Sequence, residues 1–174
     1  SDPTSFAPGL DPALFKPDAV APETRAFYES LAAEEHRRGV VKVPPDGKYD
    51  VAMEREQRAT IEYVSPLASE RTVPGPAGDV QIRILRPNIV RAVYVYIHGG
   101  CWVSGGCEQQ DTQLERIARV ASAAVVSIGY RLAPEYPYPA APDDCEAATR
   151  WVIEHAANEF GTERTMIGGA SAGA

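Results

Sequence analysis

The second part of the chain alternates strand-like runs with longer helical patterns. Short runs rich in apolar or β-branched residues occur at 93–97, 123–128 and 164–168, and the run at 123–128 is continuously apolar, as in a strand buried on both faces. Helical periodicity fills about 109–121 and 143–158 between them. Strands that alternate with helices in this way predict right-handed crossovers and a mainly parallel sheet flanked by helices.

Two more strands are expected ahead of this region. The segment Thr60–Val64 is short and β-branched. In Asp79–Leu85, apolar residues alternate with polar ones, which is typical of a half-exposed antiparallel strand. The sequence therefore predicts an α/β fold that begins with strands and continues as alternating strands and helices.

The first fifty residues are rich in proline and charge and predict a helical arm. Pro22–Arg38 has a proline in its first turn, a basic C-terminal end and a glycine after it, and these features are typical of one amphipathic helix. Phe27 and Leu31 lie four residues apart and are expected to form its buried stripe. The stretch Pro44–Gly47 is expected to break the chain before the main sheet.

Charge and hydropathy exclude several classes of partner. The 174 residues carry a formal net charge of −7, which argues against nucleic acid or an anionic membrane surface as a partner. No run of eighteen apolar residues is present, so no membrane span is expected. The start, Ser1 to Pro3, has no basic and apolar leader pattern, so no signal peptide is expected.

The three cysteines, Cys101, Cys107 and Cys145, have neither a disulfide framework spacing nor a metal-binding spacing. The three histidines do not cluster with them, so we expect no metal site. Reduced thiols in a cytoplasmic protein are the simplest interpretation.

One short motif indicates nucleophilic chemistry. The sequence Gly169-x-Ser171-x-Gly173 directly follows a predicted strand. A nucleophilic serine must stand on a sharp strand-to-helix turn, and its neighbours must be small because the backbone passes close to them. Taken alone, the pattern also fits an ordinary glycine-rich turn.

A second glycine-rich segment, His98-Gly99-Gly100-Cys101-Trp102, follows the strand at 93–97. Such a loop can present consecutive backbone N–H groups, which stabilise the negative oxygen that develops during acyl transfer. We expect His98 to support the loop through a hydrogen bond rather than to act as the catalytic base. A plain turn between strand and helix is the alternative.

The third signature is Tyr130-Arg131-Leu132-Ala133-Pro134-Glu135-Tyr136-Pro137-Tyr138-Pro139, continuing to Asp144. Together with the two glycine motifs, it resembles the serine esterases of the hormone-sensitive-lipase-like group of α/β-hydrolases. The resemblance covers about residue 60 to the end. It implies that residues 56–174 form the N-terminal half of an α/β-hydrolase core and that residues 1–55 form a helical arm or cap segment.

The resemblance also implies roles for individual residues. Ser171 matches the family's nucleophile. The N–H groups of Gly100, Cys101 and Ala172 match the oxyanion-hole donors, and Gly99 supplies the turn before them. Trp102 matches an aromatic residue that usually packs beside the loop, and we expect it to support the loop together with His98. The implied reaction is the hydrolysis of a small carboxylic ester through a serine acyl-enzyme, with no cofactor.

Two departures from the family pattern leave alternatives open. Cys101 stands where the family has a third glycine, so its thiol is expected to narrow the acyl pocket, and a nucleophilic role for Cys101 is the alternative. Ala170 stands where an acidic residue commonly precedes the serine. The motifs also resemble those of arylformamidases, which keeps a formamide substrate open. A non-catalytic binding protein of the same fold is the alternative from another class.

The catalytic acid and base are expected outside these residues. In this fold the acid and then the histidine follow the serine in the chain, and only three residues follow Ser171 here. We expect a second polypeptide or a missing C-terminal half to complete the fold. His36 or His155 as the base would require another topology. Asp143 and Asp144 are expected to be structural, at a helix start.

Overall fold

The structure is a computed structural model, and it describes residues 21–38, 50–59 and 63–174. Internal contacts divide the chain into two units, residues 1–49 and 50–174. In the first unit, α1 spans Pro22–Arg38, as predicted. The predicted buried stripe is wrong, because Phe27 and Leu31 are 63% and 40% exposed. Two apolar residues make a stripe narrower than the face that a helix normally buries. The predicted chain break at Pro44–Gly47 lies outside the described residues.

The second unit is built on one mixed sheet of five strands in the order β1-β2-β4-β3-β5. The strands are β1 (Ala68–Gly75), β2 (Gly78–Leu85), β3 (Ala92–Ile97), β4 (Ala123–Gly129) and β5 (Thr165–Gly169). β2 pairs antiparallel with both β1 and β4, whereas β3 pairs in parallel with β4 and β5. The parallel part therefore consists of β3, β4 and β5, which alternate with α3 and α4 along the sequence, and the antiparallel part comes from the hairpin at one edge.

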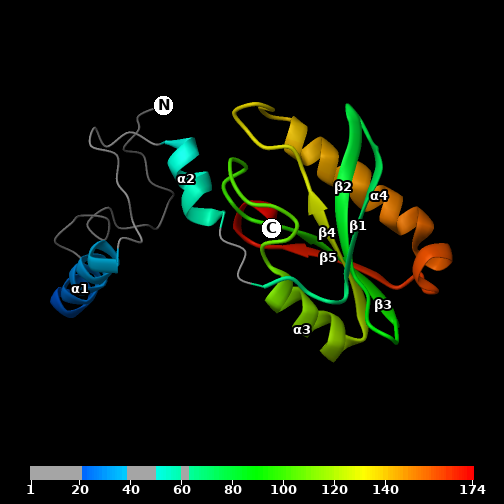
Figure 1. The fold of residues 1–174 in the computed structure, drawn as a ribbon, viewed down its shortest axis with the longest axis horizontal. Helices are drawn as coiled ribbons and strands as arrows, with labels where there is room; N and C mark the ends of the chain where they lie inside the picture. The colour runs from blue at the N-terminus through cyan, green and yellow to red at the C-terminus, as the bar shows by residue number, and fades with distance from the viewer. Residues whose placement is uncertain (1–20, 39–49, 60–62) are drawn as a thin grey trace, which may run out of the picture. The chain divides into compact units, whose positions relative to one another are not determined.

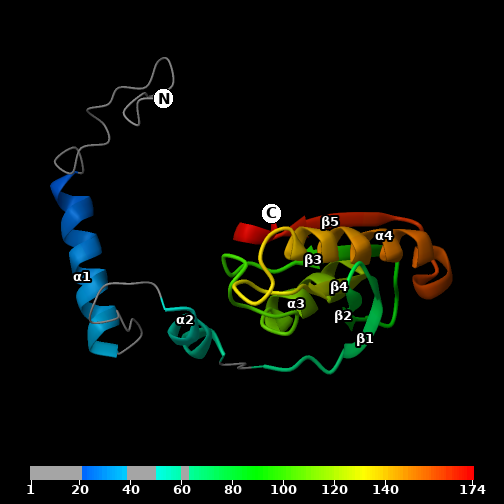
Figure 2. The ribbon, with the colours of Figure 1, turned by 90° about the horizontal axis from the view of Figure 1, so that it is seen from above.

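Three helices accompany this sheet: α2 (Val51–Arg58), α3 (Asp111–Ala121) and α4 (Ala140–Phe160). α3 and α4 pack on opposite faces of the sheet, each in its own hydrophobic cluster (Figures 1 and 2). Each ends at a residue with left-handed backbone, Ser122 after α3 and Gly161 after α4, whose N–H bonds a carbonyl of the last turn. None of the helices in the described segments is long and apolar enough to cross a membrane.

The core lies on both sides of β4, the middle strand. Six of its seven residues are buried, as predicted for the continuous apolar run at 123–128. On the α4 side, Val95, Val126 and Ile128 pack with Ala148 and Val152. On the α3 side, a smaller cluster joins Leu85, Tyr96 and Val125 to Leu114 and Ala118. Because β3 is part of this core and β5 pairs with β3, the carboxyl ends of both strands are held in fixed positions for the loops that follow.

The prediction of a strand at Thr60–Val64 is wrong for the two of its residues that the structure describes. Tyr63 and Val64 lie in no strand, and residues 60–62 lie outside the described range. The N–H and the hydroxyl of Ser65 are bonded to carboxylates of α3 and not to a neighbouring strand. The first strand is instead β1, a mostly polar segment in which Val73 alone is buried.

The strand predicted at Asp79–Leu85 is β2, and it is antiparallel, as predicted. Most of its residues are buried, whereas we expected a half-exposed strand. Arg83 of β2 is 5% exposed because the carboxylate of Asp111 receives its Nε and Nη2 at 2.9 and 2.6 Å. The hydrogen bonds that Arg83 donates to Asp111 are the main cause that raises the pKa of this guanidinium. Asp111 also accepts the N–H of Ser65, so this buried pair fixes the start of α3.

Candidate active site

Ser171 lies on a sharp turn immediately after β5. Its φ is 53°, in the left-handed region that non-glycine residues rarely adopt. A short 3-10 turn, Ser171–Gly173, follows and uses the N–H groups of Gly173 and Ala174 for its hydrogen bonds. The N–H of Ala172 takes no part in those two bonds. The exposed serine therefore stands at a strained turn, with a backbone donor in the next residue.

The two glycines around Ser171 are required by close backbone contacts. A Cβ on Gly169 would overlap the carbonyl of Gly173 and would lie 2.7 Å from the oxygen of Ile97. A Cβ on Gly173 would overlap Ile97 and lie 2.7 Å from the oxygen of His98. The turn is thus pressed against the end of β3, which is the physical reason for the Gly-x-Ser-x-Gly spacing.

Gly99, at the start of the glycine loop, lies against the same turn. A Cβ on Gly99 would lie 3.2 Å from the Cβ of Ser171 and 2.8 Å from the carbonyl oxygen of Ala170. The structure therefore brings the two glycine motifs together, although about seventy residues separate them in the sequence.

The carbonyl of Gly100 is turned into the loop. It accepts the N–H groups of Val103 and Ser104, both at 3.0 Å, and the Ser104 hydroxyl at 3.1 Å. In a trans peptide the C=O and N–H point in opposite directions, so the N–H of Cys101 points out of the loop. Gly100 itself has φ 125° and no room for a Cβ beside Ser104, so only glycine fits here.

The next two residues are held in strained backbone conformations. Cys101 and Trp102 have φ of 54° and 61°, and each such conformation costs an L-residue about 1–2 kcal/mol. Cys101 stands where the family has a glycine, and its backbone still has the left-handed conformation that glycine favours. Cys101 is exposed and Trp102 is half-exposed.

His98 is buried, and its ring bonds the backbone of the glycine loop. Its Nδ1 lies 2.7 Å from the carbonyl oxygen of Gly99, which can only accept, so Nδ1 carries the proton. Burial lowers the pKa of His98, which favours the neutral ring. Its position and its bonding agree with loop support.

The loop between β4 and α4 packs beside the glycine loop. The N–H of Ala133 donates to the carbonyl of Trp102 at 2.8 Å. The carboxylate of Asp144 is buried and receives the Nε and Nη2 of Arg131, each at 2.8 Å, and the N–H of Arg131 at 3.0 Å. Asp144 is therefore structural, as predicted, and Asp143 is exposed at the same helix start.

A cavity of about 680 Å³ opens beside these loops. Its walls are mostly aromatic and aliphatic, and they include Cys101, Trp102, Tyr130, Tyr136, Tyr138 and Ala172. An apolar cavity of this size, lined by Cys101 and by Ala172, the residue after Ser171, can accommodate a small organic substrate.

Neither histidine whose side chain is described reaches Ser171. His98 bonds Gly99, while His155 bonds the carbonyl of Trp151 and stacks on that indole ring on α4. The side chain of His36 lies outside the described part of the chain. In that described part, no three His, Cys, Asp or Glu side chains gather closely enough to hold a metal ion.

Comparison with known proteins agrees with this geometry. A family model described as the alpha/beta hydrolase fold matches residues 94–174. Carboxylesterase NlhH of Mycobacterium tuberculosis is 37% identical over 179 aligned residues, which cover 99% of this chain and 51% of that protein. Carboxylic ester hydrolase LipN of the same organism is 43% identical over 109 residues, covering 60% of this chain and 29% of that protein.

Solved structures give the same result. A hyperthermophilic esterase from the archaeon Pyrobaculum calidifontis superposes with a TM-score of 0.68 at 31% identity, covering 88% of this chain and 50% of that one. The chain has the α/β-hydrolase fold. The resemblance to the hormone-sensitive-lipase-like group is confirmed, and this α/β-hydrolase chain spans about half the length of NlhH and of the archaeal esterase.

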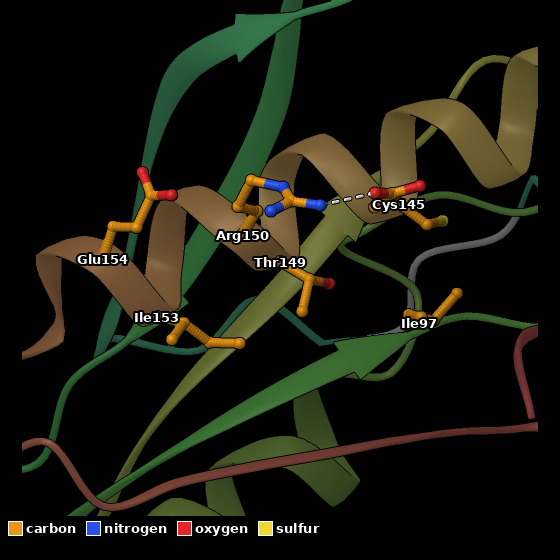
Figure 3. Close-up of a pocket in the computed structure, with 7 residues that line it drawn as sticks. Ile97, Cys145, Thr149, Arg150, Ile153 and Glu154 are labelled. Carbon is orange, nitrogen blue, oxygen red and sulfur yellow. Dashed lines mark hydrogen bonds and ion pairs between the residues drawn. The ribbon is translucent and has the colours of Figure 1, made fainter.

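A second hollow of the α/β-hydrolase chain, about 480 Å³, runs along α4 (Figure 3). Ile97, Cys145 and Ile153 line it, together with Arg150 and Glu146, which form an ion pair. Burial raises the pKa of the Cys145 thiol to about 12, so this thiol stays protonated at neutral pH and is a poor nucleophile.

Sequence reasoning missed one element of the site. The helix α2 was not predicted, and its Arg55 bonds both the glycine loop and the β4–α4 loop. The only sequence signal was Asp50, which caps α2 by accepting the N–H groups of Ala52 and Met53.

Proposed function

We propose that this chain supplies the nucleophile and the oxyanion hole of a carboxylic ester hydrolase. Ser171 Oγ attacks the ester carbonyl carbon, and the carbonyl oxygen becomes an oxyanion. The N–H groups of Gly100, Cys101 and Ala172 stabilise that charge. The C–O bond to the alcohol then breaks, and the acyl group stays on Ser171 until water releases it as the carboxylic acid.

The observation that carries the proposal is the contact between Gly99 and Ser171. Because a Cβ on Gly99 would lie 3.2 Å from the Cβ of Ser171, the glycine loop starts directly beside the serine. The outward N–H of Cys101 and the N–H of Ala172 belong to residues that both line the large cavity. A carbonyl in that cavity would lie beside both the nucleophile and the donors.

We infer that the acid and the base that activate Ser171 come from polypeptide outside these 174 residues. Both described histidine side chains are engaged elsewhere, and relatives such as NlhH are about twice as long. Without a base, a serine hydroxyl is a poor nucleophile at neutral pH. The test of function therefore requires the full-length protein that contains this chain.

The experiment is a burst assay on that full-length protein with p-nitrophenyl butyrate. We expect a rapid release of p-nitrophenol, of about one equivalent per active site, followed by slower turnover. Ser171→Ala is expected to abolish the burst and to lower kcat by at least about a thousandfold. The matched control is Ser122→Ala, at the left-handed end of α3, which is expected to keep the burst.

Two results would contradict the proposal. If the folded full-length protein gave no burst and no turnover with any short-chain ester, a binding role would be favoured. If it hydrolysed an N-formyl aniline but no ester, the chemistry would be that of a formamidase.

A further inference from the structure

Arg55 of α2 makes three kinds of contact around the glycine loop. Its Nε donates to the carbonyl of Val103 at 2.7 Å, and its Nη2 donates to the carbonyl of Ala133 at 2.9 Å. Its Nη1 and Nη2 also hold the two oxygens of Glu135, each at 2.8 Å. One guanidinium thus bonds two loops, one after β3 and one after β4.

These contacts join the glycine loop and the β4–α4 loop in one hydrogen-bond network. Val103 is bonded to Arg55 through its carbonyl and to Gly100 through its N–H. Trp102 is bonded through its carbonyl to the N–H of Ala133, whose own carbonyl Arg55 holds. Moving the Arg55 guanidinium would therefore release Val103 and Ala133 together.

This network holds the peptide between Gly100 and Cys101, whose N–H is the proposed oxyanion donor. The carbonyl of Gly100 is turned inward by the N–H groups of Val103 and Ser104, and this turn points the N–H of Cys101 outward. Because Cys101 and Trp102 are in left-handed conformations, this peptide relaxes unless its surroundings hold it. Val103 directly follows these two strained residues, and Arg55 holds its carbonyl.

Glu135 neutralises the charge of Arg55 and orients its guanidinium group. The hydrogen bond from Arg55 lowers the pKa of the Glu135 carboxyl to about 2, so the carboxylate is ionised throughout the neutral range. A bidentate pair fixes the plane of a guanidinium as well as its position. With that plane fixed, the remaining N–H groups reach the two carbonyls.

We propose that Arg55 is a positioning residue of the oxyanion hole: from α2 it locks the peptide before Cys101 by holding Val103 and Ala133. This inference rests on the proposed function, because it gives α2 a part in stabilising the oxyanion. Lysine does not replace arginine here, because one ammonium group lacks the planar fork that serves two carbonyls and a carboxylate.

The experiment compares Arg55→Met, Arg55→Lys and Glu135→Gln in the full-length protein. In single-turnover acylation by p-nitrophenyl butyrate, we expect Arg55→Met to lower the rate constant at saturating ester by about 10- to 100-fold, because the donors are misplaced. The half-saturating ester concentration is expected to stay within about twofold, because ground-state binding is retained. Arg55→Lys is expected to recover only part of the rate, and Glu135→Gln to lose less than Arg55→Met.

The second readout is the affinity for an aryl trifluoromethyl ketone, which adds to the serine and places an oxyanion in the hole. Its inhibition constant is expected to rise by the same factor as the acylation rate constant falls, variant by variant. A purely structural role would lower the melting temperature without this proportionality. Arg150→Met is the matched control, since Arg150 also pairs with a glutamate but is exposed on α4.

The proposal is overturned if a folded Arg55→Met acylates at the wild-type rate or if its loss is no greater than that of Arg150→Met. If Arg55→Met does not fold, Arg55→Lys decides, and wild-type acylation and inhibitor affinity in that variant would overturn the proposal. Failure of the proposed function is distinguishable, since then the wild-type protein would show no Ser171-dependent burst at all.

Discussion

The ring of His98 stacks on the ring of Tyr130, with centroids 4.1 Å apart and 10° between their planes. The Tyr130 hydroxyl also donates to the carbonyl of His98 at 2.8 Å. One residue at the end of β4 thus holds both the side chain and the backbone of the residue that begins the glycine loop. The stack buries the imidazole, and burial lowers its pKa.

This burial predicts a pH effect on stability. Because the pKa of His98 is lower in the folded state, the unfolded chain takes up the proton first as the pH falls below about 6.5. The free energy of unfolding is therefore expected to fall as the pH drops from about 7.5 to 5, and His98→Gln is expected to weaken that fall. Urea unfolding of the full-length protein at several pH values measures this. Parallel curves for the two proteins would contradict it.

The buried carboxylate of Asp144 is expected to stabilise the β4–α4 loop. Its side chain is 2% exposed, and Asp144→Ala would leave the Arg131 guanidinium, which is 28% exposed, without its bidentate partner. We expect a loss of about 3 kcal/mol in the free energy of unfolding of the full-length protein. Asp143→Ala, an exposed neighbour in the same turn, is the control and is expected to cost less than about 1 kcal/mol. Equal losses in the two variants would contradict the account.

Cys101 is expected to act through its backbone and not through its thiol. Cys101→Gly keeps the N–H donor and removes the strain of a side chain at φ 54°. We therefore expect kcat with p-nitrophenyl butyrate to stay within about threefold of the wild-type value. A loss as large as that of Ser171→Ala would instead assign the nucleophile to Cys101.

The strand β5 is expected to promote association of the 174-residue chain expressed by itself. In the described part of the chain β5 pairs only with β3, and its Met166 and Ile167 are 63% and 52% exposed. An exposed apolar edge strand is a template for pairing with another chain. Light scattering is expected to show a mass that rises with concentration and falls in Ile167→Lys, but not in the control Val120→Lys on α3. A monomer at every concentration would contradict this.

The elements that the sequence predicted well have long and regular patterns. The strands β2 to β5 and the helices α3 and α4 begin and end within a few residues of their predicted bounds. β1 was missed because its residues are mostly polar and it is held by pairing with β2, which no local pattern reveals. In α1 the helix was predicted correctly, but the burial of Phe27 was not. An amphipathic spacing alone does not provide a surface for the helix to pack against.

The site was predictable in its motifs but not in its connections. The glycine spacings around Ser171 follow from local backbone geometry, so they are visible in the sequence. Arg55 and Glu135 are 80 residues apart, and the helix that carries Arg55 is short and polar, so nothing local indicates that they meet. Contacts of this kind depend on the whole fold.

The central claim is that Ser171 is the residue that becomes acylated, and one measurement tests it directly. The full-length protein is treated with a fluorophosphonate, digested and examined by peptide mass spectrometry. We expect one phosphonate group per molecule on the peptide that contains Ser171, and none in Ser171→Ala. A label on Cys101, or no label on a folded protein, would contradict the account.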